Sequence, residues 1–169
     1  FLLVAGEAQQ LLDSENMAEL AAFCTEPWAI SAETAAGSGS WEAAACQCLQ
    51  DLEILEPDWL TLLKQWEQAP ELPGFAPQDP EKLERIAVYF AFRYLLKAVN
   101  DGDLLGRAQF CALGVLVTDR LSRFVGLPEA LRLFSREIEH DEDNLATLRE
   151  QFWQTEGLSL SALLAAFCG

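Results

Sequence analysis

The stretch from residue 80 to residue 125 reads PEKLERIAVYFAFRYLLKAVNDGDLLGRAQFCALGVLVTDRLSRFV. Its first half predicts a helix over residues 80–100, because Asp79 is a good N-cap and Pro80 suits the first helical position. Its second half predicts a helix over residues 104–125, with an Asn-Asp-Gly-Asp turn between the two. Both helices carry long apolar runs, which are typical of helices packed inside a core. We therefore expect an antiparallel helix pair at the centre of the fold.

The apolar runs also predict which side chains of this pair are buried. Ile86 to Phe92 is entirely apolar, and so is the middle of the second helix. That second run is too short to cross a bilayer, which takes about 20 residues. Six side chains of the pair are expected in the core: Tyr89, Phe90, Phe92, Leu95, Leu113 and Leu116.

The rest of the chain extends the pair into an all-α compact bundle of about eight helices. Helical apolar spacing and capping residues recur on both sides of the pair, and no segment shows the alternation typical of a strand. Residues 69–79, APELPGFAPQD, are rich in proline and predict a linker. We therefore predict one helical domain over residues 1–169, with an acidic N-terminal helical layer at 1–68 and a core bundle at 80–169.

The charge of the chain is strongly acidic and unevenly distributed. The formal net charge is −16, and no Lys or Arg precedes Lys64. Nucleic-acid binding needs clustered cations, and an anionic membrane surface also attracts basic segments, so neither partner is expected. The acidic first third is either a solvated face or a docking surface for a basic partner protein.

The five cysteines predict neither a disulfide framework nor a metal cluster. Their number is odd and no C-x-x-C motif occurs. We expect reduced thiols in a cytoplasmic protein and no cofactor bound to this chain.

The only histidine, His140, lies in an E-x-x-H pattern with Glu137. On an α-helix this spacing places both side chains on one face. Di-iron bundles need two such motifs, and a second histidine is missing, so no di-metal site is expected. A mononuclear site that recruits other acids, and a histidine simply hydrogen-bonded near a helix end, both remain open.

Several charged residues occur among apolar neighbours and predict a polar network where the turn of the helix pair meets a later helix. A buried charge needs a partner, so Arg93 or Arg107 is expected to pair with Asp103 or Glu137, mostly shielded from water. The network is either structural or a clamp for an anionic ligand or substrate. The candidate residues are Arg93, Lys97, Asp103, Arg107, Arg136, Glu137 and His140. No nucleophile motif, P-loop or dinucleotide fingerprint occurs, so no catalytic residue is predicted.

Three segments of the sequence carry a resemblance to a known family. FRYLLKAVNDGDLLGRAQFCALGVLV, then LRLFSREIEHDEDNLATLREQFW and the closing LSLSALLAAF, resemble the C-terminal helical region of the flagellin lysine-N-methylases over residues 84–167. The resemblance implies a helical region that follows a cysteine cluster with an iron–sulfur centre, in an enzyme that acts on a lysine-bearing protein. This chain carries no such cluster, so no family metal ligand maps onto it.

Two functions follow as hypotheses. The resemblance implies the C-terminal helical module of a protein-lysine N-methylase-like enzyme, which supports the catalytic region and substrate docking, with any iron–sulfur centre in a preceding region. The charge favours a non-enzymatic acidic helical module that binds a basic partner protein. An excised piece with several clustered cysteines before Phe1 is expected under the first hypothesis only.

Overall fold

The computed structural model describes residues 2–16, 18–19, 23, 40–69 and 79–168. The α-helices in this part of the chain are α1 (Leu2–Asp13), α3 (Trp41–Asp51), α4 (Pro57–Gln68), α5 (Pro80–Tyr94), α6 (Ala98–Asp101), α7 (Leu104–Val125), α8 (Leu127–Phe134), α9 (Glu142–Gln154) and α10 (Leu160–Cys168). Short 3₁₀ turns occupy Leu95–Lys97 and Glu156–Leu158, and a π-helical turn occupies Ser135–Glu139. The described residues contain no strand, and the prediction of an all-α bundle is confirmed.

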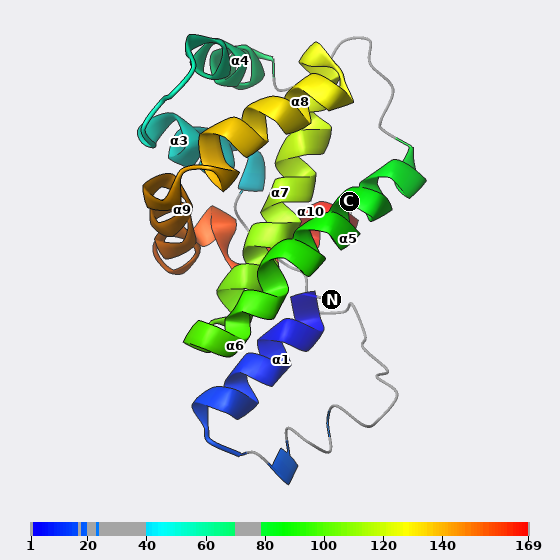
Figure 1. Ribbon diagram of the computed structural model, residues 1–169, viewed down its shortest axis with the longest axis vertical. Helices are drawn as coiled ribbons and strands as arrows, with labels where there is room; N and C mark the ends of the chain where they lie inside the picture. Colours follow the sequence, from blue (N-terminus) through cyan, green and yellow to red (C-terminus); the bar gives the residue numbers. More distant parts are fainter. Residues whose placement is uncertain (1, 17, 20–22, 24–39, 70–78, 169) are drawn as a thin grey trace.

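Helix α7 is the axis of the molecule (Figure 1). It contacts α1, α4, α5, α8, α9 and α10, and it is buried around nearly its whole circumference. Asp103 caps its first turn by accepting a hydrogen bond from the backbone N–H of Gly106 at 2.8 Å. Gly126 ends it with a φ of 82°, a conformation that favours glycine. The predicted second helix therefore has the observed bounds.

Helix α5 packs against α7 through a cluster of aromatic rings. Asp79 caps α5 as predicted, by accepting from the backbone N–H of Glu81. Phe90 is fully buried, and its ring meets those of Phe110 and Phe134 edge to face, with centroids 6.2 and 5.6 Å away. A Cβ atom on Gly114 would lie 3.0 Å from the Phe90 ring, so the glycine allows the two helices to approach closely.

The outer side of α5 differs from the prediction. The helix ends at Tyr94 and continues only as the 3₁₀ turn and the short α6. Phe92 is 77% exposed and Tyr89 is 44% exposed, so the prediction that both are buried is wrong. Phe90 and Leu113 are buried as expected, whereas Leu95 and Leu116 are half-buried. An apolar run indicates that a helix packs against other elements. It does not indicate how many sides of the helix those elements cover.

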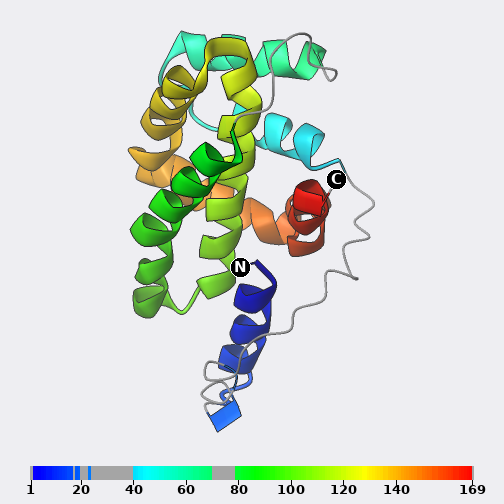
Figure 2. The ribbon, with the colours of Figure 1, turned by 90° about the vertical axis from the view of Figure 1, so that its right-hand side faces the viewer.

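The remaining helices cover different parts of α7 (Figures 1 and 2). Helix α1 lies towards the end where α7 begins, whereas α3 and α4 lie towards its other half, with α3 against the Glu156–Leu158 turn. In Figure 2, α8 lies on the side of α7 away from α10, and α9 passes behind α7 towards the Glu156–Leu158 turn. The expected linker at 69–79 lies almost entirely outside the described residues, and the proposed division into layer, linker and core bundle stays a prediction.

Candidate functional site

The expected polar residues form separate groups rather than one network. In the first group, the Arg107 side chain donates to both carboxylate oxygens of Asp101, with Nε 3.1 Å from Oδ1. Arg149 of α9 bridges Asp101 and Asp103. The Arg107 guanidinium, helped by the Asp103 N–H and by Arg149, lowers the pKa of Asp101 to about 2. This group fastens the turn between α6 and α7 to α9.

In the second group, three side chains of α5 meet the carboxylate of Glu139. The Tyr89 and Tyr94 hydroxyls both donate to its Oε1 atom, at 3.0 and 2.8 Å. Arg93 Nε lies 3.3 Å from the same oxygen, and Lys97 Nζ lies 5.2 Å from the centroid of the Tyr94 ring. Burial and the bond to Glu139 raise the pKa of Tyr94, which therefore stays a protonated donor. The group ties α5 to the π-helical turn.

In the third group, Glu137 is fully buried but pairs with backbone N–H groups rather than with a cation. Its two oxygens accept hydrogen bonds from the N–H groups of Leu55 and Glu56, at 2.9 and 2.7 Å. Asn144 lies beside it, donating to the Glu53 and Glu137 carbonyl oxygens and accepting from the Glu53 N–H. Glu137 thus holds the start of α4 against the π-helical turn.

These contacts correct the expected pairing. Arg93 binds Glu139 and Arg107 binds Asp101, so neither side chain reaches Glu137 or Asp103. Arg107 is buried as expected, whereas the Arg93 side chain is 40% exposed.

The π-helical turn explains why Glu139 was missed. The His140 N–H bonds to the Ser135 carbonyl oxygen at 3.0 Å, so one extra residue is fitted into the turn. As a result Glu137 and the side chain of Glu139 are both shielded from water, whereas His140 is exposed. Glu137 and His140 therefore do not share a face, and the His140 ring makes no hydrogen bond or ion pair with any described residue. The described residues also contain no group of three or more potential His, Cys, Asp or Glu metal ligands.

Arg136 also lies apart from the other candidates. Its Nε atom is 3.5 Å from Glu56 Oε1, and its side chain is 62% exposed. An ion pair in water at this exposure contributes little to stability.

The described cysteine thiols are not poised for chemistry. Cys46, Cys48 and Cys111 are free and buried, as expected for reduced thiols. Burial raises the pKa of Cys48 to about 11 and that of Cys111 to about 12. Neither is a thiolate at neutral pH, so neither is an activated nucleophile. The side chains of Cys24 and Cys168 lie outside the described part.

An exposed apolar stripe on α5 and its continuation was not predicted. Its members are spaced three or four residues apart, so they follow one side of the helix. Each is at least 62% exposed: Val88 at 62%, Phe92 at 77%, Leu96 at 63% and Val99 at 89%. We call these four residues the α5 stripe. Single exposed apolar residues are ordinary, whereas a continuous row of them marks an interaction surface.

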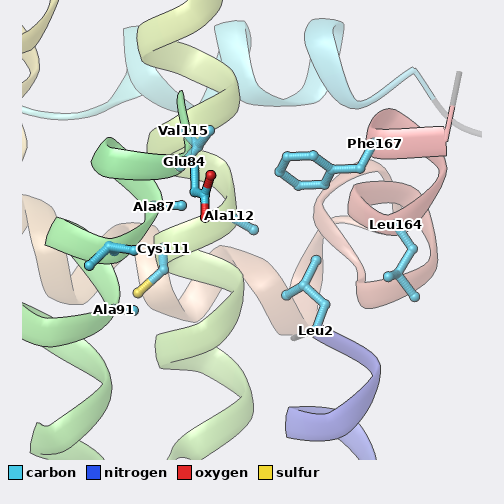
Figure 3. A pocket seen from close by; sticks show the side chains of 10 residues that line it. Leu2, Glu84, Ala87, Ala91, Cys111, Ala112, Val115, Leu164 and Phe167 are labelled. Atoms are coloured by element: carbon cyan, nitrogen blue, oxygen red, sulfur yellow. The ribbon is translucent and has the colours of Figure 1, made fainter. Parts of the chain in front are cut away.

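Beside the stripe lies an apolar hollow of about 420 Å³ between α5, α7, α10 and the start of α1 (Figure 3). Small side chains of α5 and α7 form one side, and side chains of α10 and α1 face them across the opening. Its lining residues are Leu2, Glu84, Ala87, Val88, Ala91, Cys111, Ala112, Val115, Leu164 and Phe167. We call this hollow the α5–α10 groove. Among the described residues that line it, Glu84 is the only charged one.

Comparisons with protein-family models, curated proteins and solved structures return no match to this chain. No described helix is long and apolar enough to cross a membrane. The polar groups act as structural clamps between elements, and the α5 stripe and the α5–α10 groove are exposed apolar surfaces.

Proposed function

We propose that this chain is the C-terminal helical module of a protein-lysine N-methylase-like enzyme, where it supports the catalytic region and helps to dock the substrate protein. The observation that carries the proposal is the α5 stripe, since large apolar side chains in a row favour contact with another protein surface. Residues 84–167 resemble the helical region of the flagellin lysine-N-methylases, and this resemblance favours the catalytic region of such an enzyme as the surface that contacts the stripe. The stripe lies within the resembling segment.

The surroundings of the stripe also suit a protein interface. Tyr89 and Arg93 flank it, and tyrosine and arginine are enriched at the centres of interfaces. Both are held in place by Glu139, so little side-chain freedom is lost on binding. A surface prepared in this way binds with less entropic cost than one with free side chains.

The charge of the chain supports a role in substrate docking. A net charge of −16 attracts a lysine-bearing protein and raises the rate of encounter. The stripe would therefore hold the catalytic region, and the acidic surface would steer the substrate.

The test uses the parent polypeptide and measures methyl transfer to a lysine-bearing protein. We expect Phe92→Asp combined with Leu96→Asp to reduce the rate by at least about tenfold, because both side chains are exposed in this chain and would be buried against the catalytic region. The matched control is Trp153→Asp, which changes another exposed aromatic residue on α9 and leaves the rate unchanged. Equal rates in all three proteins would contradict the proposal.

A second function, a non-enzymatic acidic module that binds a basic partner protein, is favoured by the lone carboxylate of Glu84 in the α5–α10 groove. The parent reading frame distinguishes the two. Several closely spaced cysteines before Phe1 support the enzyme module, and a parent without them supports the binding module.

A further inference from the structure

The α5–α10 groove is a ready-made site between helices. Its α5 and α7 side is built from Ala87, Ala91 and Ala112, whose short side chains leave the hollow open. Leu164 and Phe167 of α10 stand on the other side. The volume of about 420 Å³ falls in the range of protein ligand sites, roughly 300–1,000 Å³.

The shape of the apolar surface favours a polypeptide over a small molecule. A small-molecule site encloses most of its ligand. Here the hollow is open, because two of its lining side chains, Val88 and Phe167, stay 62% and 52% exposed. An open apolar groove with exposed apolar side chains in its lining matches one face of an amphipathic helix lying along it.

The charge at the groove defines the occupant further. Glu84 is exposed on α5 and forms no ion pair or hydrogen bond with any described residue. Arg85, the next residue along α5, pairs with Glu81 rather than with Glu84. Helix α10 has no charged residue, and none of the described lining residues is basic. The groove therefore repels a carboxylate or phosphate and attracts an ammonium or guanidinium group.

We propose that the α5–α10 groove binds an amphipathic helix of a partner protein, with its apolar face over the alanines and a Lys or Arg paired with Glu84. The inference rests on the second function proposed above, the acidic module that binds a basic partner protein, and it specifies the chemistry of that partner. It rests on a surface that needs neither Phe92 nor Leu96, so each proposal can fail alone.

The experiment titrates the 169-residue chain into a fluorescein-labelled helical peptide of roughly five turns. The peptide is made of Ala and Gln, with Leu at positions i, i+3, i+4 and i+7 and one Lys beside the Leu face. A matched peptide carries Glu in place of the Lys. We expect the Lys peptide to bind at least about tenfold more tightly than the Glu peptide. Glu84→Lys should reverse that order, because the variant exchanges the sign of the charge at the groove.

Filling the groove provides the steric test. Ala91→Phe should weaken binding of the Lys peptide at least about tenfold, whereas Ala146→Phe on the exposed face of α9 should not change it. If Ala91→Phe impairs folding, an NMR titration of the unchanged chain serves as the test instead. The methyl signals of Leu2, Val115 and Leu164, which line the groove, should shift when the Lys peptide binds. Methyl signals that do not shift would overturn the proposal. So would equal affinities for the Lys and Glu peptides, or an order of affinities that Glu84→Lys leaves unchanged. Loss of binding only in Phe92→Asp would place the peptide on the stripe and would also overturn it.

Discussion

At the scale of single residues, Glu137 makes the strongest prediction about stability. Replacing it with Ala leaves two N–H groups, those of Leu55 and Glu56, without an acceptor. A donor left unpaired away from water costs about 1–3 kcal/mol, and both bonds are part-buried, so Glu137→Ala should lower the free energy of unfolding by about 3–5 kcal/mol in a urea titration. Glu137→Gln keeps one acceptor and should lose less. The exposed Glu150→Ala should change stability by less than about 0.5 kcal/mol, and an equally small loss for Glu137→Ala would contradict the buried contacts.

Asp101 predicts a dependence of stability on pH. Its folded pKa of about 2 lies below its ordinary value of 3.8, so its contribution to stability is complete above about pH 4. That contribution is lost as the pH falls from about 4 to about 2, because the carboxyl group protonates first in the unfolded chain, and the loss is complete once the folded group is protonated too. Asp101→Asn should therefore lose less stability than the unchanged protein over this window. Parallel curves of unfolding free energy against pH would show that Arg107 does not stabilise the ionised carboxylate.

The local chemistry of single residues was predictable from the sequence, whereas their long-range partners were not. Asp79 caps α5 and Gly126 ends α7, because caps depend only on neighbours in the chain. The bond from Tyr94 to Glu139 spans 45 residues and depends on the π-helical turn, and so does the pairing of Arg93 with Glu139. No periodicity in the sequence marks that turn, so the expected partner was the wrong glutamate.

At the scale of elements, α5 shows that hydrophobicity and burial are separate properties. Phe90 and Phe92 are two residues apart, yet one is fully buried and the other 77% exposed. Phe90→Ala should lower the free energy of unfolding by about 3–5 kcal/mol, as is typical of a deleted core ring. Phe92→Ala should cost less than about 1 kcal/mol in the same denaturant titration. A large loss at Phe92 would mean that another part of this chain covers the stripe.

Burial was predicted correctly for α7 but only in part for α5, because the other described helices surround α7 and cover only one side of α5. Helix α7 was predicted to be buried, and it is, because other helices surround it. Helix α5 has an equally apolar run, but among the described elements it packs on one side only. An apolar run looks the same in the sequence whether its helix side is buried in the core or exposed on the surface. The α5 stripe was not predicted for this reason.

At the scale of the whole molecule, the structure separates stabilising groups from exposed binding surfaces. The clamps at Asp101, Glu137 and Glu139 join elements that are far apart in the chain. The α5 stripe and the α5–α10 groove adjoin one another at Val88, on a chain with a net charge of −16. An apolar surface within an acidic molecule suits a partner that combines apolar and basic residues.

The most direct test of the central claim is the accessibility of the stripe inside the parent polypeptide. A cysteine placed by Leu96→Cys should react quickly with a maleimide in this chain alone, because Leu96 is 63% exposed. In the parent polypeptide the rate, measured at that peptide by mass spectrometry, should fall at least about tenfold. Ala146→Cys on α9 is the control and should react at the same rate in both proteins. Equal rates for Leu96→Cys in the chain and in its parent would contradict the claim that the stripe is a docking surface.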